Sequence, residues 1–221
     1  MSINSNFYNQ LQTKPKAISF DWDGTLCDTR PAVVKAINFV LKKYNLDNWE
    51  ITKSKRDKNK SFKENFPNFF NDSYEQAYIE YLDYYEKECL DNVKIIDGSD
   101  VFLKKLINSG IFIYIISNKE KSLLMKEAMI HFNDISFKNI LGNGDAIENK
   151  PSPAPLIKAF YELSIPINCD NFWHIGDTNQ DYDSAVKANV LPIMIVKGKL
   201  KEKTNFEFDG FHDLIKNISW L

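Results

Sequence analysis

The chain has 221 residues, of which 43% are hydrophobic, and a formal net charge of −2 at pH 7. This length and composition can build a full hydrophobic core and exclude a globally disordered chain. The near-neutral charge argues against wholesale binding to nucleic acid or membrane surfaces, and no apolar run approaches the ~20 residues of a membrane span.

The N-terminal residues and the cysteines indicate the cellular compartment of the protein. Residues 1–13 are polar and lack the apolar stretch of a signal peptide, so we expect a loose N-terminal extension. Cys27, Cys89 and Cys169 are an odd number without a CxxC pair, which is typical of free thiols in a reducing environment. We therefore expect a cytoplasmic protein.

Two carboxylates follow the first apolar run, which lies at residues 17–20 and predicts a buried strand. Asp21 and Asp23 are two positions apart, so their side chains share one face where the strand ends. Gly24 and Thr25 then turn the chain. Two acids this close repel each other unless a cation or a shared proton relieves them, which predicts a metal-assisted or acid/base site.

The next segment, residues 29–93, predicts a helical lobe without strands. Helical periodicity covers about residues 31–44, and tyrosines recur at a 3.6-residue period in an acidic helix at 72–91. A basic run at 51–66 lies between them, and one of its cations is a candidate to contact an anionic substrate tail. These candidates are Lys53, Lys55, Arg56, Lys58 and Lys60.

The second half alternates strands with helices, which predicts a doubly wound parallel sheet of the α/β class. Ser99 is a candidate cap for the first helix of this half, and Gly110 a candidate stop. Strands are expected at 111–116, 137–141, 172–175 and 192–196, helices at about 99–107, 120–130, 155–163 and 181–188, and a last strand and helix within 206–221.

Polar residues follow the predicted strands at 17–20, 111–116 and 172–175, and ligands of open α/β sheets bind outside the carboxyl ends of the strands. We therefore expect Asp21, Asp23, Ser117 and Asp177 to converge there, with Lys150 joining from a helix start. Mg²⁺ is commonly held by one or two carboxylates plus a substrate phosphate, and a lysine can offset part of the phosphate charge. A carboxylate can form an aspartyl-phosphate while a second carboxyl protonates the leaving oxygen.

Four motifs in this order resemble the haloacid dehalogenase (HAD) superfamily of phosphatases. They are DWDGTL at 21–26, Ser117 in IISNK, Lys150 in KPSPAPL and GDTNQD at 176–181. The helical insert is similar to the phosphoglycolate phosphatase-like subgroup with a C1-type cap. The resemblance implies a Rossmann-like core at 14–28 and 94–221, with a cap at 29–93.

The same resemblance implies roles for individual residues. Asp21 would attack phosphorus, and Asp23 would be the general acid/base, its backbone carbonyl also touching Mg²⁺. Asp181 would support the metal site or orient the lysine. The full implied set is Asp21 and Asp23 as catalytic residues, Ser117, Asn118 and Lys150 as phosphate-binding residues, Asp21, Asp23 and Asp177 at the metal, and Asp181, Gly24 and Thr25 in support.

The expected function is a Mg²⁺-dependent phosphatase that hydrolyses a small phosphorylated metabolite, as a monomer or homodimer without nucleic-acid or membrane partners. One alternative is a sugar phosphomutase of the same superfamily, which would have the same motifs. The other is a protein without enzymatic activity, a phosphoacceptor or regulatory module. The helical insert has no glycine, unlike many relatives, which leaves the substrate open. His174, inside an apolar strand, is interpreted as a packed core histidine.

Overall fold

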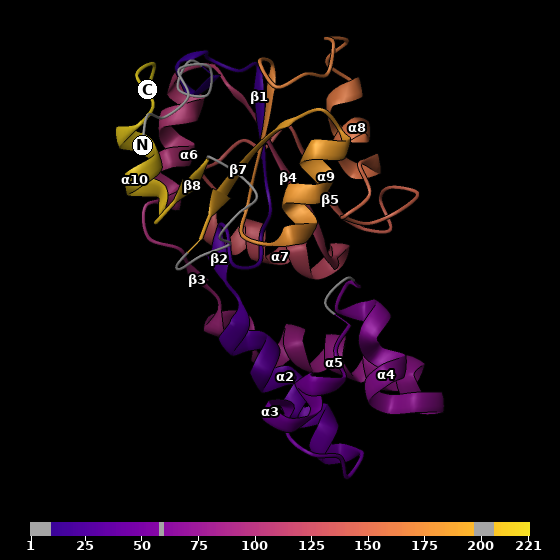
Figure 1. The fold of residues 1–221 in the computed structure, drawn as a ribbon. Helices are drawn as coiled ribbons and strands as arrows, with labels where there is room; N and C mark the ends of the chain where they lie inside the picture. Colours follow the sequence, from indigo (N-terminus) through magenta and orange to yellow (C-terminus); the bar gives the residue numbers. More distant parts are fainter. Residues whose placement is uncertain (1–9, 58–59, 197–205) are drawn as a thin grey trace, which may run out of the picture.

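The computed structural model describes residues 10–57, 60–196 and 206–221, and its centre is a six-stranded parallel sheet (Figure 1). The strand order is β5-β4-β1-β6-β7-β8, which confirms the predicted fold class. The strands are β1 (Ala17–Phe20), β4 (Phe112–Glu120), β5 (Asn139–Asn143), β6 (Phe172–Gly176), β7 (Leu191–Ile195) and β8 (Glu207–Phe208). β1 lies in the middle and pairs with β4 on one side and β6 on the other.

Helices cover both faces of the sheet because its strands are apolar on both sides. In β1, Ile18 and Phe20 belong to one buried cluster and Ala17 to the other, as the two-residue period of a strand requires. One cluster includes residues of α6 (Ser99–Asn108), α7 (Lys121–His131) and α10 (Phe211–Lys216), and the other includes residues of α8 (Ala154–Tyr161) and α9 (Asn179–Lys187).

A helical lobe lies beyond the carboxyl ends of the strands (Figure 1). The chain enters it after β2 (Cys27–Asp28) and leaves it before β3 (Lys94–Ile95), and these two strands pair antiparallel. Residues 29–57 and 60–93 contain no strand, as predicted. The lobe comprises α2 (Arg30–Lys43), α3 (Trp49–Thr52), α4 (Phe66–Phe70) and α5 (Tyr74–Glu88), with 3₁₀ turns at Lys53–Lys55, Lys63–Asn65, Asn71–Ser73 and Leu90–Asn92.

Two local predictions differ from the structure. Ser99 is the first residue of α6 and does not cap it, because Gly98, at φ +78°, takes the cap position. The Ser99 hydroxyl instead donates to the backbone oxygen of Leu26 at 3.2 Å. Strand β4 also runs past the apolar residues to Glu120, with a shift of register after Ile116, so Ser117 and Asn118 lie within the strand.

The described start of the chain is packed against its end. Leu11 is 5% exposed, and the Trp220 indole donates to its backbone oxygen at 2.9 Å. Residues 10–13 of the expected loose extension are therefore held in place, while residues 1–9 lie outside the described residues. In the described part of the chain, no helix is long and apolar enough to cross a membrane. The three cysteines are free thiols, as predicted.

Candidate active site

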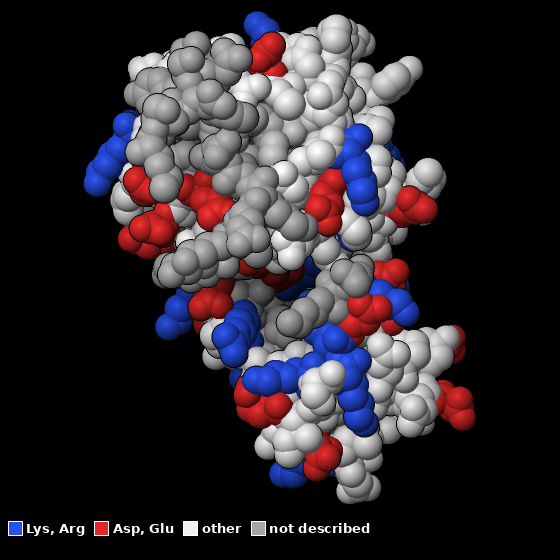
Figure 2. Space-filling model, in the orientation of Figure 1, with Lys and Arg blue, Asp and Glu red and all other residues white. Residues whose placement is uncertain are grey.

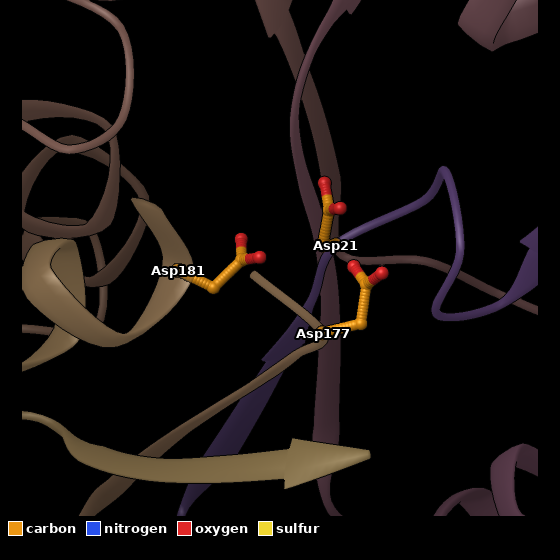
Figure 3. Close-up of side chains that lie close together, drawn as sticks. All are labelled: Asp21, Asp177 and Asp181. Atoms are coloured by element: carbon orange, nitrogen blue, oxygen red, sulfur yellow. The ribbon is translucent and has the colours of Figure 1, made fainter. Parts of the chain in front are cut away.

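Asp21 and Asp177 lie side by side because they follow neighbouring parallel strands (Figure 3). The Asp21 backbone N–H donates to the Ile175 oxygen at 2.8 Å, which continues the β1–β6 pairing to the site. The Thr25 hydroxyl donates to Asp177 Oδ1 at 3.3 Å. Gly24 has a φ of +88°, and a Cβ there would lie 2.5 Å from Asp177 Oδ2, so both its conformation and its space require glycine.

Lys150 lies in the turn before α8, and its side chain contacts Asp21. Its ammonium donates to Asp21 Oδ1 at 2.7 Å, to Asp181 Oδ1 at 2.6 Å and to the Ile116 backbone oxygen at 2.7 Å. The Asn118 side chain binds both backbone polar groups of Lys150, at 2.8 Å to its oxygen and 3.0 Å to its nitrogen. The side chain of Asn118 thus fixes the position of Lys150.

Asp181 is held by the N-terminal turn of α9. Its Oδ2 accepts from the Thr178 backbone N–H at 3.0 Å and from the Thr178 hydroxyl at 2.5 Å, in a capping box. Its Oδ1 lies 3.3 Å from His174 Nε2, and His174 Nδ1 lies 2.8 Å from the Ser19 hydroxyl. A fully buried His174 fits the sequence interpretation, but its contact with Asp181 was not predicted.

The carboxylate set fits a divalent cation. One oxygen from each of Asp21, Asp177 and Asp181 lies within 4.8 Å of the others. Burial raises the pKa of Asp21 to about 7, against the opposing effect of Lys150, and burial together with Asp21 raises the pKa of Asp177 to about 8. Burial also disfavours ionised Asp181, but Lys150 and His174 keep its pKa below the ordinary value. A cation would stabilise the two carboxylates whose pKa values are raised.

Of the three predicted metal-binding residues, Asp21 and Asp177 come together, whereas the side chain of Asp23 is engaged elsewhere. Asp23 Oδ1 accepts a short hydrogen bond from the Thr29 hydroxyl and lies 2.9 Å from the ammonium of Lys119. Ser117 is 5% exposed and lines the same cavity as Asp21 and Asp23.

A cavity of about 940 Å³ lies between these residues and the helical lobe. Figure 2 shows Lys and Arg side chains along the part of the lobe that faces the core. Of the predicted cationic candidates, Lys53 and Arg56 line the cavity, and Arg30 and Lys63 also contribute. Lys55 and Lys60 are not among its lining residues, and Lys58 lies outside the described residues.

Comparisons with known proteins match the chain to a hydrolase family. The profile of the family described as haloacid dehalogenase-like hydrolase matches residues 18–195. The chain is 28% identical to a Caldanaerobacter subterraneus protein named as the pyrophosphatase PpaX. The match covers 93% of this chain and 95% of that protein. The phosphoglycolate phosphatase of Neisseria gonorrhoeae is 24% identical, with 83% and 80% covered.

Solved structures share the fold. The crystal structure of a predicted phosphoglycolate phosphatase from Haemophilus somnus has a TM-score of 0.80 at 21% identity, with 91% of this chain and 97% of that chain covered. CbbY from Rhodobacter sphaeroides, in complex with phosphate, has a TM-score of 0.76 at 17% identity, with 93% and 99% covered.

Proposed function

The chain belongs to the haloacid dehalogenase-like hydrolase family, and from this premise we propose that it is a phosphatase acting on small phosphorylated metabolites through an aspartyl-phosphate. The observation that carries the proposal is the contact of Lys150 with Asp21, at 2.7 Å, beside Asp177 at the carboxyl ends of β1 and β6. In this arrangement the Asp21 carboxylate and the Lys150 ammonium are both held in place beside a cavity that is large enough for a metabolite.

In the first half-reaction, a carboxylate oxygen of Asp21 attacks phosphorus and the bond from phosphorus to the leaving oxygen breaks. Asp23 gives its proton to that oxygen, which leaves as a neutral alcohol. Lys150 and the Ser117 hydroxyl hold oxygens of the phosphoryl group, together with backbone N–H groups near Gly24 and Asn118. The product of this step is a phosphoryl group on Asp21.

In the second half-reaction, the Asp23 carboxylate takes a proton from water, and the water oxygen attacks phosphorus. The bond between phosphorus and the Asp21 oxygen breaks, so inorganic phosphate leaves and both aspartates return to their starting states. Asn118 keeps Lys150 in place throughout, and Asp181 keeps the ammonium pointed at the site.

We propose Mg²⁺ as the cofactor, held by the side chains of Asp21 and Asp177 and by the backbone carbonyl of Asp23. When bound, the ion supplies positive charge that offsets the charge of the phosphoryl group. Asp181 already accepts hydrogen bonds from Lys150 and Thr178, so we assign it the role of orienting Lys150 and not that of a direct metal ligand.

We further propose that residues 29–93 act as the cap over a core formed by 14–28 and 94–221. A lobe on the far side of the cavity from the carboxylates can exclude water and contact the leaving group. The protein would work in the cytoplasm as a monomer or homodimer.

The test is release of inorganic phosphate from a panel of phosphorylated metabolites, with Mg²⁺ and with EDTA. We expect turnover that needs the metal and is abolished in Asp21→Asn. Asp170→Asn, an exposed carboxylate away from the site, is the matched control and should keep wild-type activity. Full activity of Asp21→Asn would overturn the proposal, and transfer of phosphate to a sugar without its release would indicate a mutase.

A further inference from the structure

We propose that Lys119, Glu127 and Tyr85 form a positioning network for the Asp23 carboxylate, and that the network links the orientation of Asp23 to helix α5 of the helical lobe. The inference rests on the proposed function, because it takes Asp23 as the general acid/base. Glu127 and Tyr85 lie outside the four sequence motifs, and Lys119 is the last residue of IISNK, where the motif assigned it no role.

Lys119 is the centre of the network. Its side chain is 7% exposed, and its ammonium lies 2.9 Å from Asp23 Oδ1, 3.1 Å from Glu127 Oε1 and 3.1 Å from the Tyr85 hydroxyl oxygen. These three acceptors match the three N–H donors of a lysine. The ammonium also lies 4.8 Å from the centroid of the Tyr85 ring. Lys119 is therefore held from several sides at once.

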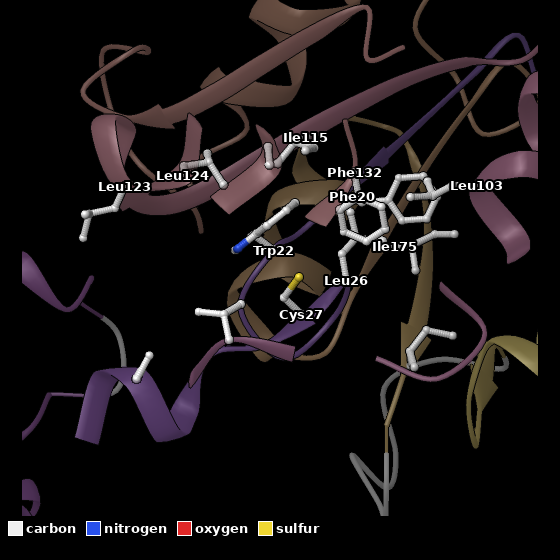
Figure 4. Packing of buried hydrophobic residues seen from close by; sticks show 14 of the residues in the cluster. Phe20, Trp22, Leu26, Cys27, Leu103, Ile115, Leu123, Leu124, Phe132 and Ile175 are labelled. Carbon is white, nitrogen blue, oxygen red and sulfur yellow. The ribbon is translucent and has the colours of Figure 1, made fainter. Parts of the chain in front are cut away.

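Glu127 is a buried acid on the core side of the network, with a fully buried side chain. Its Oε2 accepts from the Trp22 indole at 2.5 Å, and its Oε1 accepts from the Tyr85 hydroxyl at 2.6 Å. Figure 4 shows Trp22 among apolar side chains of the core, including Leu124 and Phe132. Burial raises the pKa of Glu127, and the Lys119 ammonium opposes that effect.

A buried ion pair contributes little net stability, since well-packed hydrophobic residues commonly do as well. Packing alone therefore does not explain the pair. Its geometry suggests another role, because Glu127 fixes the ammonium of Lys119 at the Asp23 carboxylate.

Tyr85 brings the helical lobe into this network. Lys119 lies in β4 and Glu127 in α7, whereas Tyr85 lies in α5 of the lobe. The Tyr85 hydroxyl donates to Glu127 and accepts from Lys119, so a side chain of the helical lobe contacts both members of the core pair. A displacement of α5 would remove one of the acceptors of Lys119 and one of the donors of Glu127.

The network determines which carboxyl oxygen of Asp23 can donate a proton. Lys119 and Thr29 both donate to Oδ1, so Oδ2 is the oxygen that can carry the proton to the leaving group. Without Lys119 the carboxyl can rotate about its Cβ–Cγ bond, and the proton is no longer presented in one direction. The positioning role therefore affects proton donation more than phosphoryl binding.

Leaving-group dependence tests this role. With wild-type enzyme and Mg²⁺, kcat/KM is measured for alkyl phosphates and for 4-nitrophenyl phosphate, whose leaving group needs little protonation. The ratio kcat/KM reports the step that expels the leaving group, so the later base role of Asp23 does not enter. Lys119→Met should lower kcat/KM about 100-fold for alkyl esters and only a few-fold for the aryl ester.

Three further variants separate positioning from folding. Lys119→Met leaves Glu127 buried without its cation, so Lys119→Met/Glu127→Gln should recover thermal stability and still show the steeper leaving-group dependence. Tyr85→Phe should shift the dependence in the same direction by a smaller factor. Tyr84→Phe, one residue away on α5, is its matched control and should leave the dependence unchanged.

Lys126→Met is a second control, because Lys126 and Glu86 form an exposed ion pair that also joins α7 to α5. It should keep the wild-type dependence. Equal losses on alkyl and aryl esters in Lys119→Met, or the same shift in Lys126→Met, would overturn the inference while leaving the proposed function intact. No turnover of any ester by the wild-type enzyme would overturn the proposed function itself, and this inference with it.

Discussion

Lys150 Nζ lies 2.6 Å from Asp181 Oδ1, although the two residues reach the site from different segments of the chain. Lys150 precedes α8, and Asp181 lies in the first turn of α9. The two are 3% and 1% exposed, so water screens their interaction little, and each stabilises the charged form of the other. The same ammonium reaches Asp21, so this pair connects the architecture of the sheet to the candidate nucleophile.

Lys150→Met should lower the free energy of unfolding by about 3 kcal/mol, because it leaves Asp181 buried without its cation. Urea denaturation measures this loss. Lys150→Met/Asp181→Asn should recover much of the stability but no phosphatase activity. Lys158→Met, which changes an exposed lysine nearby, should be neutral in both assays. A single variant as stable as the wild type would contradict the importance of the pair.

The carboxylates predict a pH dependence in the metal-free protein. In the folded state the pKa is about 7 for Asp21 and about 8 for Asp177, against 3.8 ordinarily. Between pH 3.8 and pH 8 the folded protein thus binds more protons than the unfolded chain does. Its free energy of unfolding therefore falls as the pH rises towards 8. With EDTA, the melting temperature should be lower at pH 8 than at pH 7.

Added Mg²⁺ should reverse this trend, because the ion binds the ionised carboxylates and competes with protons. The increase in melting temperature on adding Mg²⁺ should therefore be larger at pH 8 than at pH 7. Asp177→Asn is the comparison. In this variant both the pH dependence of the melting temperature and its increase on adding Mg²⁺ should be smaller. A Mg²⁺-induced increase that is the same at the two pH values would count against the proposed metal ligands.

The positions of Asp21 and Asp177 could be predicted from the sequence because they depend on local patterns. Each follows an apolar run that reads as a buried strand, and parallel strands bring their carboxyl ends to one edge. Lys150 and Ser117 were identified by their order along the chain. Thr178 was not, although the spacing from Thr178 to Asp181 is that of a capping box.

The Lys119–Glu127 pair could not be predicted, because its meaning depends on tertiary packing. Glu127 lies in a helix, where an acid usually faces water. Only the approach of Tyr85 from α5, and of Trp22 from the turn after β1, makes its environment buried and polar. Ser99 was likewise expected to cap α6, but Gly98 has that position and the Ser99 hydroxyl donates to Leu26, a residue distant in the sequence.

Gly24→Ala should lower Mg²⁺ affinity because the new methyl group would press on the Asp177 carboxylate, 2.5 Å away. Gly110→Ala is a matched control, since Gly110 also has a left-handed φ, +72°, but open space around its Cβ position. Both variants should lose about 1 kcal/mol of stability from backbone strain. Only Gly24→Ala should weaken Mg²⁺ binding, measured by calorimetry, and equal affinities in the two variants would argue against a metal beside Asp177.

The cationic side of the cavity predicts a preference for substrates whose leaving group carries its own negative charge. Arg56 lines the cavity, whereas Lys55, one residue earlier, does not. Arg56→Met should raise KM about tenfold for such a substrate, the cost of losing one charged hydrogen bond, and should leave KM for 4-nitrophenyl phosphate unchanged. Lys55→Met removes the same charge from the same turn and should change neither value. If the two variants raise KM equally, the effect comes from the overall charge of the lobe and not from a contact of Arg56 with the substrate.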